Sequence, residues 1–269
     1  MQSPADYDTL LAELVETASA YPHLAEAIDL ECALLEAGSR LEVSIPPVSL
    51  TRDIAQGRLE SGLPLLPQEE VLVSGGQQLS DFRRTVGSLV AAHRPELSDE
   101  LDRLSRATTP PCSGQSMAGQ ESHSELGSYI QHQTLRPFLV AHACALAAML
   151  SDMNFTGWQC PICGSGPDMA ALTRPDGQRI LLCSACDTRW PCQRIGCPFC
   201  GNEDPSTWAY YPSDDGVYRL YVCDACGGYL KTVDQREQVR PRLLATERIL
   251  TIGMDAAAVD AGYQILPGD

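Results

Sequence analysis

Eight of the twelve cysteines in this 269-residue chain occur as four C-x-x-C pairs between residues 160 and 226. The pairs are Cys160/Cys163, Cys183/Cys186, Cys197/Cys200 and Cys223/Cys226. Secreted disulfide scaffolds are usually shorter than this chain, so the pairs favour metal binding in a reducing compartment. Four thiolates around one ion leave no open coordination position. We therefore expect a structural or electron-transferring metal rather than a catalytic metal with a bound water.

The intervals between successive pairs indicate two separate four-cysteine sites. They are nineteen, ten and twenty-two residues long, and the two long intervals match the spacing of ribbon-type sites. The sequential assignment joins the first pair to the second and the third to the fourth. A cross-braced arrangement, with the first pair joined to the third and the second to the fourth, is the alternative.

Two of the pairs have the form C-P-x-C-G, at Cys160–Gly164 and at Cys197–Gly201. This is the pattern of a metal knuckle, in which a tight turn brings two thiolates to one ion and the glycine permits the backbone conformation that follows. An all-sulfur tetrahedral site suits zinc or a single rubredoxin-type iron. The expected cofactors are therefore two metal ions, iron or zinc.

The remaining four cysteines carry weaker signals. Cys32 and Cys144 fall in helical patterns and are expected to be small buried hydrophobic residues, and Cys112 falls in a loop. Cys192 lies between the two predicted sites, where a substitute ligand is the alternative to a packing role. The chain has no G-x-S-x-G, P-loop or G-x-G-x-x-G motif. We expect that it is not an enzyme.

The segments that carry the cysteines read as two β-hairpins of similar size. Strands are predicted over 168–173 and 178–182 around a Pro-Asp-Gly turn, and over 207–211 and 217–222 around a second Gly-containing turn. Each hairpin is bracketed by two C-x-x-C pairs, which indicates an internal duplication.

The rest of the chain reads as helical. Helices are predicted over 7–18, 22–37, 69–95, 98–104 and 121–153, the last kinked or restarted at Pro137, and again from 241 onward. Residues 45–67, with four prolines, are predicted to be an extended connection, and 107–120 a loop.

Together these patterns predict an α+β protein with a multihelical N-terminal domain, two rubredoxin-like or zinc-ribbon four-cysteine modules and a C-terminal helix. The expected domains are 1–157 (acidic and helical), 158–195 (first ribbon), 196–236 (second ribbon) and 237–269, a helix that packs on the rest. No secretory signal is visible at the start of the sequence, and the apolar run from Phe138 to Leu150 is too short for a bilayer span. We expect a cytoplasmic protein without membrane insertion.

The charge distribution argues against a nucleic-acid partner. The net charge is −16, and residues 158–236 hold six Arg and one Lys against nine acids. Binding to phosphates needs a basic face, which this composition does not provide. A protein, or a basic segment of one, fits the acidic field better.

Several residues around the cysteines make the motif more specific than a generic zinc ribbon. The pattern reads C-P-x-C-G-S-x-P from Cys160, L-C-x-x-C-D-T-x-W up to Trp190, R-x-x-C-x-x-C from Arg194, C-x-x-C-G-x-Y-L-K up to Lys231 and A-G-Y at 261–263. In this order the pattern resembles the formate dehydrogenase accessory protein FdhE family. The N-terminal domain is shorter and more divergent than that of the family.

The resemblance implies an accessory or assembly factor for respiratory formate dehydrogenase that binds the catalytic subunit before export. By position, it implies that the eight paired cysteines are metal ligands, and the family is associated with iron at these sites. Four further residues match other family positions: Trp190, Arg194, Tyr229 and Lys231. Contact with a partner and simple packing within the ribbon are the two interpretations of these residues. Two other functions stay open at this point: a rubredoxin-like electron-transfer protein and a nucleic-acid-binding zinc ribbon. The sequence does not indicate the oligomeric state.

Overall fold

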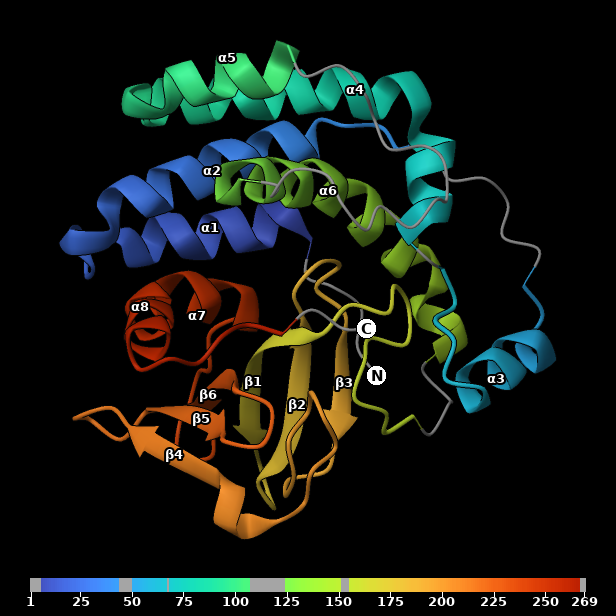
Figure 1. Ribbon diagram of the computed structural model, residues 1–269, viewed down its shortest axis with the longest axis vertical. Helices are drawn as coiled ribbons and strands as arrows, with labels where there is room; N and C mark the ends of the chain where they lie inside the picture. Colours follow the sequence, from blue (N-terminus) through green and yellow to red (C-terminus); the bar gives the residue numbers. More distant parts are fainter. Residues whose placement is uncertain (1–5, 44–49, 67, 107–123, 151–154, 267–269) are drawn as a thin grey trace.

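The computed structural model describes residues 6–43, 50–66, 68–106, 124–150 and 155–266. Helices make up the first half, and the second half forms a six-stranded sheet followed by two short helices (Figure 1). This arrangement confirms the predicted α+β class with helices at both ends of the chain.

The first two helices form a hairpin that lies close to the sheet. Helix α1 (Tyr7–Ala18) is present as predicted, and Asp6 caps it: the Asp6 carboxylate accepts a hydrogen bond of 2.8 Å from the backbone N–H of Thr9. A 3₁₀ turn (Pro22–Leu24) leads into α2 (Ala25–Ser39). Buried side chains of both helices, among them Leu10 and Ile28, share a core with β1, β2 and residues near the C-terminal end of the chain, such as Leu244.

The longer helices α4 (Gln68–His93) and α6 (Glu125–Leu150) pack against each other and against α2. The backbone of α4 breaks at Gly76, where φ is 45°, a conformation that glycine adopts without strain. The rings of Phe82 and Phe138 meet edge to face, with centroids 6.3 Å apart. Helix α5 (Ser98–Arg106) follows α4, and the predicted loop 107–120 lies outside the described residues.

The prediction of an extended connection over 45–67 is wrong at its centre, where α3 (Arg52–Glu60) forms. The Thr51 hydroxyl caps this helix by accepting a hydrogen bond of 3.4 Å from the N–H of Ile54. In sequence, the four prolines lie before and after the helix rather than inside it. Only Ala55 of the helix is buried, so the apolar periodicity that would have indicated a helix is weak.

The two predicted hairpins are present, and each gains a third strand. The first unit consists of β1 (Pro167–Thr173), β2 (Gln178–Cys183) and β3 (Arg189–Cys192), and the second of β4 (Trp208–Pro212), β5 (Tyr218–Cys223) and β6 (Gly228–Asp234). Pairing is antiparallel within each unit, whereas β1 and β6 pair in parallel. The sheet order is therefore β3-β2-β1-β6-β5-β4. The predicted ribbons thus join in one sheet; the domain boundaries themselves stay a prediction.

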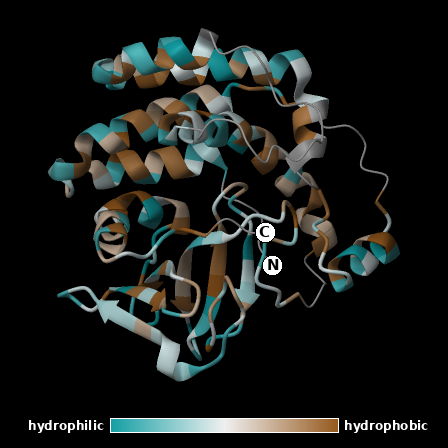
Figure 2. Cartoon of the chain, in the orientation of Figure 1, coloured by the Kyte–Doolittle hydropathy of each residue, from teal (hydrophilic) through white to brown (hydrophobic). Residues whose placement is uncertain are grey.

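Two helices rather than one close the chain. Helix α7 (Leu244–Leu250) packs on β1 and α1, and α8 (Ile252–Asp260) packs on β6. In Figure 1 the helices α1, α2, α4, α5 and α6 lie on one side of the sheet region, and α7 and α8 lie beside it. Figure 2 shows that β1 and β2 are largely hydrophobic, whereas β4 at the far edge is pale, close to the middle of the hydropathy scale.

Among the described residues, α6 alone is long and apolar enough to cross a membrane by length and composition. In the fold, 61% of its apolar window is buried against the rest of the protein. A core helix of a folded domain meets the same criterion, so burial in the protein interior accounts for the apolar composition of α6.

Candidate metal centres

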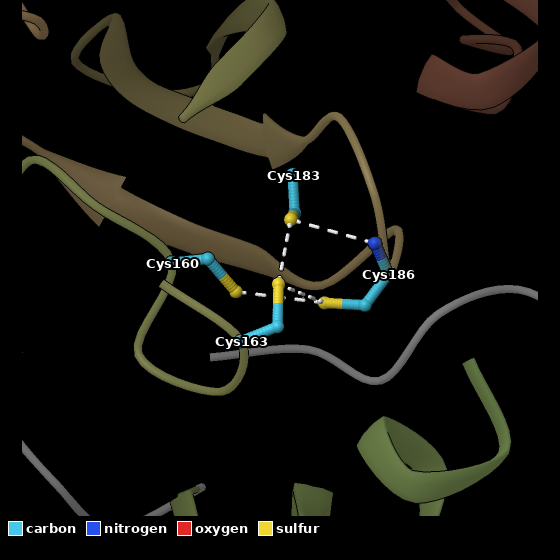
Figure 3. A group of neighbouring side chains, drawn as sticks. All are labelled: Cys160, Cys163, Cys183 and Cys186. Atoms are coloured by element: carbon cyan, nitrogen blue, oxygen red, sulfur yellow. Dashed lines mark hydrogen bonds between the residues drawn. The ribbon is translucent and has the colours of Figure 1, made fainter. Parts of the chain in front are cut away.

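The first group of four cysteines is built from two turns that face each other. Cys160 and Cys163 lie on the knuckle that precedes β1, while Cys183 ends β2 and Cys186 lies in the turn that follows (Figure 3). The closest sulfur–sulfur distances are 3.5 Å (Cys160–Cys186), 3.4 Å (Cys163–Cys183) and 3.6 Å (Cys163–Cys186). Tetrahedral zinc with Zn–S bonds of about 2.3 Å would hold its sulfurs about 3.8 Å apart. A thiophilic ion therefore fits after small movements.

The backbone of this knuckle has the features that the sequence pattern predicted. Gly164 N–H donates to the Cys160 carbonyl over 3.0 Å, and Gly164 has a φ of 79°, where other residues would be strained. On the opposite turn, the N–H groups of Ala185 and Cys186 point at the Cys183 sulfur over 3.4 Å. Such N–H donors stabilise negative charge on a thiolate ligand.

The second group repeats this geometry with Cys197, Cys200, Cys223 and Cys226. Two sulfur pairs lie 3.6 Å (Cys197–Cys226) and 3.9 Å (Cys200–Cys223) apart. In both groups all four sulfur atoms lie within 4.8 Å of one another. The structure thus brings the cysteines together in the sequential arrangement, not the cross-braced one.

The two groups differ in their contact with solvent. All four cysteines of the first group are buried, and they belong to the same hydrophobic core as Phe82 and Phe138 of the helical layer. In the second group Cys200 is exposed and Cys226 is half-buried. An open cleft of about 440 Å³ lies between the groups and is lined by Trp158, Cys160 and Cys200, among others.

The thiols of the first group have strongly shifted pKa values. Burial raises the pKa of Cys160, Cys183 and Cys186 well above the usual range. Hydrogen bonds from the neighbouring thiols, Cys160 first, lower the pKa of Cys163 well below it. Binding of a metal ion would release the protons that these thiols carry.

A buried network of charged residues surrounds the first group. Asp187, directly after Cys186, has a φ of 56° and accepts hydrogen bonds from Arg136 of α6 and Arg248 of α7. Arg248 also donates to Asp168 over 2.9 Å and to the Cys183 carbonyl over 2.8 Å. Burial disfavours the Asp187 carboxylate, but the two arginines outweigh this effect and lower its pKa to about 2.

Sequence reasoning missed this network because its members are far apart in the chain. Glu31 completes it, accepting from Arg136 over 2.6 Å. A signal was present for Arg136, a lone charge in an otherwise apolar stretch of helix, which implies a buried partner.

Three of the four residues for which the resemblance left open partner contact or ribbon packing are buried in the chain itself. Trp190 is fully buried and its ring N–H donates to the Gly157 carbonyl over 3.0 Å. Lys231 pairs with Asp255 of α8 over 2.6 Å, and the Tyr229 hydroxyl donates to the same carboxylate over 2.9 Å. Arg194 is exposed. Contact of these four residues with a partner stays a prediction.

The other cysteines follow the predictions only in part. Cys192 is buried and Cys32 is half-buried, but Cys144 is exposed, so the prediction that it is buried is wrong. Cys144 lies on the outward side of α6, next to the buried Ala143. Cys112 lies outside the described residues.

No protein-family model matches the chain. A protein named FdhE homolog from Aquifex aeolicus is 25% identical over 239 residues, which cover 82% of this chain and 79% of the relative. Protein FdhE from Escherichia coli O127:H6 is 24% identical over 226 residues, covering 78% and 68%. The crystal structure of the FdhE protein from Pseudomonas aeruginosa superposes with a TM-score of 0.63 at 19% identity, over 98% of this chain and 95% of that one.

The structural likeness establishes a shared fold, and the sequence similarity extends across both the helical and the cysteine-containing regions. The chain is thus similar in sequence to proteins named FdhE and similar in fold to the FdhE protein of known structure.

Proposed function

We propose that the chain is a non-catalytic accessory factor for a respiratory formate dehydrogenase and that it binds the catalytic subunit in the cytoplasm before export. The observation that carries this proposal is the pair of four-cysteine groups on a fold similar to that of FdhE. The FdhE names of the relatives supply the link to formate dehydrogenase. Nucleic acid and membrane insertion form no part of the proposal.

We further propose that Cys160, Cys163, Cys183 and Cys186 hold one metal ion, iron or zinc, and that Cys197, Cys200, Cys223 and Cys226 hold a second. The donor set supports this, because four thiols of each group converge within 4.8 Å. When bound, zinc would supply a fixed cross-link between turns, and iron would add a one-electron couple. The chain itself provides the knuckle N–H groups and the buried network that orient the sulfurs.

A test of the proposal uses a host that lacks this chain and makes a respiratory formate dehydrogenase. We expect formate-dependent dye reduction in the membrane fraction to be lost and to return with the wild-type chain. Cys183→Ser should fail to restore it, whereas Cys144→Ser, which changes a cysteine outside both groups, should restore it fully. Full activity without the chain would exclude the accessory role.

Binding is measured separately with purified components. The full chain, loaded with metal, is titrated against the catalytic subunit that still carries its export segment. Saturable binding that is lost in the exported, mature enzyme would support action before export. Equal binding to both forms would contradict that part of the proposal but not the accessory role.

Electron transfer through rubredoxin-like iron is the second candidate, and the exposure of Cys200 favours it because electrons need a short path to a metal site. It predicts ferric–thiolate absorption and a reversible redox couple in the anaerobically purified chain. Two zinc ions per chain and no visible absorption would exclude it.

A further inference from the structure

The sheet ends at β4, and this edge differs from the opposite one. At the β3 edge, the side chains of Trp190 and Cys192 are buried. All but one of the β4 residues are exposed, with exposed fractions of 51% for Tyr210 and 57% for Tyr211. Large aromatic side chains at an open strand edge are unusual for a surface that stays in water.

The register of β4 on β5 shows which backbone groups point outward. Asp224 N–H donates to the Thr207 carbonyl over 2.8 Å at one end, and Ser213 N–H donates to the Tyr218 carbonyl over 2.9 Å at the other. Hydrogen-bonded pairs alternate along an antiparallel ladder, so Ala209 and Tyr211 also pair with β5. The backbone groups of Trp208, Tyr210 and Pro212 therefore point away from the sheet. All three residues present a carbonyl there, but only Trp208 and Tyr210 also present an N–H donor.

This edge lacks the usual protection against strand pairing. Soluble proteins commonly block open edges with lysine, inward-pointing charges or a bulge. None of the five residues of β4 is charged, and its register on β5 continues without a bulge. Pro212 stands at the end of the strand, where it stops pairing without blocking the two outward N–H groups.

Aromatic contacts hold the strand in place before any partner binds. Trp208 and Tyr210 lie on one face, where both rings contact Tyr221 of β5 at centroid distances of 5.5 and 5.4 Å. The Arg219 guanidinium lies 5.2 Å from the centre of the Tyr210 ring. A strand fixed in this way loses little conformational entropy on binding.

Charges at both ends of the strand indicate what could pair with it. Exposed acidic residues lie before β4, in the β4–β5 turn and after β5; they are Glu203, Asp204, Asp214, Asp215 and Asp224. Two basic side chains lie nearby: Arg219 is paired with Asp234 over 2.7 Å, and Arg179 is fully buried beneath the Trp208 ring. A second copy of this chain, paired edge to edge, would bring these carboxylates against each other, whereas a basic segment would be attracted.

We propose that the β4 edge is a docking site for an extended, arginine-containing segment of a protein partner, which adds to the sheet as a seventh strand. Backbone hydrogen bonds to Trp208, Tyr210 and Pro212 would supply affinity, and the tyrosine rings and flanking carboxylates would select basic side chains. The inference goes beyond the accessory role and does not depend on which protein supplies the segment.

The test uses a fluorescent peptide of about ten alternating arginine and threonine residues, titrated with the full metal-loaded chain and followed by anisotropy. We expect saturable binding that weakens as salt is raised. A peptide with glutamate in place of arginine should not bind. Absence of binding of the arginine peptide up to about 1 mM would overturn the proposal.

A matched pair of variants at Tyr210 separates the backbone from the side chain. Proline at 210 removes an outward N–H but leaves the ladder to β5 intact, so the fold should be preserved. We expect Tyr210→Pro to weaken binding at least about tenfold more than Tyr210→Ala does, because alanine keeps the outward N–H. Equal effects of the two variants would show that no strand is added.

Amide exchange gives a readout that does not rely on a variant. In the free chain the Tyr210 N–H should exchange quickly and the Tyr211 N–H slowly, because only the latter bonds to β5. The peptide should slow exchange at Trp208 and Tyr210. Protection of Tyr210 in the free chain at high protein concentration, together with a dimer in sedimentation, would assign the edge to a second copy instead.

Discussion

Arg136 and Asp187 form a buried ion pair that connects the helical layer to the first four-cysteine group. The guanidinium of Arg136 donates to Asp187 Oδ2 over 3.1 Å and 2.9 Å, and both side chains are about 5% exposed. Asp187 directly follows Cys186, and Arg136 lies at the centre of α6. The turn next to Cys183 and Cys186 is therefore fixed by a helix that precedes the sheet in the chain.

Removing Arg136 should destabilise the whole fold. Arg136→Met leaves the Glu31 and Asp187 carboxylates buried with one partner fewer, which costs about 3–5 kcal/mol in comparable buried pairs. Urea unfolding of the metal-loaded chain measures the loss. The control is Arg84→Met, which breaks an exposed pair with Asp81 and should cost less than about 1 kcal/mol. Similar losses in both variants would mean that the buried network contributes no more than a surface pair.

The two metal sites should release their ions at different rates. Zinc in the second group should leave first on addition of a chelator, because Cys200 is exposed while the first group lies within the core. A coloured zinc chelator should show two phases, of which Cys200→Ser removes the fast one and Cys163→Ser the slow one. Iodoacetamide with mass spectrometry gives the order of thiol reaction, with the exposed Cys144 as an internal reference. A single release phase would contradict the expected order.

A buried carboxyl in α7 should make stability depend on pH. Glu247 is fully buried, the Tyr218 hydroxyl donates to it over 2.7 Å, and burial raises its pKa. A carboxyl with a raised pKa in the folded state contributes stability below its unfolded pKa, about 4.3, and loses that contribution as pH rises through the folded pKa. The wild type therefore carries a cost at neutral pH that glutamine would not.

We expect Glu247→Gln to raise the free energy of unfolding by up to about 1 kcal/mol at pH 8, with a smaller gain at pH 5. Unfolding in urea at both pH values measures the difference. Glu16→Gln, at an exposed position of α1, should change stability little and equally at both pH values. A destabilised Glu247→Gln at pH 8 would show that the charge is stabilised by its surroundings.

The sequence predicted elements whose signals are local. Helix α1, the Pro-Asp-Gly turn between β1 and β2, and the C-P-x-C-G knuckles each depend on residues close together in the chain. The spacing of the eight cysteines favoured the sequential grouping, because a hairpin brings its two flanking pairs together, and the structure distinguishes it from the cross-braced alternative.

The missed features depend on residues far apart in sequence. Strand β6 was not predicted, because it is defined by pairing with β5 and by the parallel register with β1, which brings Met169 beside Lys231. The charged network was missed for the same reason: Glu31, Arg136, Asp187 and Arg248 meet only after the helices pack on the sheet. The local sequence patterns that predict a helix or a hairpin do not indicate such contacts between distant residues.

The single lysine of the chain offers a site-specific reporter of how α8 sits on the sheet. Lys231 is 2% exposed, and its ammonium group binds the Asp255 carboxylate over 2.6 Å and the Arg248 carbonyl over 3.1 Å. An acylating reagent needs a free, accessible amine. Acetylation of Lys231 in the folded chain should therefore be at least about tenfold slower than in the urea-unfolded chain.

Asp255→Ala should accelerate this reaction. The variant leaves the Lys231 ammonium and the Tyr229 hydroxyl without their shared acceptor, a loss of about 2 kcal/mol that favours opening of α8. Peptide mass spectrometry measures acetylation at Lys231 over time, and Asp260→Ala, at an exposed position of the same helix, is the control. If Asp255→Ala reacts no faster than Asp260→Ala, then packing of Ala258 and its neighbours, rather than the ion pair, holds α8 on β6. A faster reaction in Asp255→Ala alone would show that the Lys231–Asp255 pair holds α8 on β6 of the second cysteine unit.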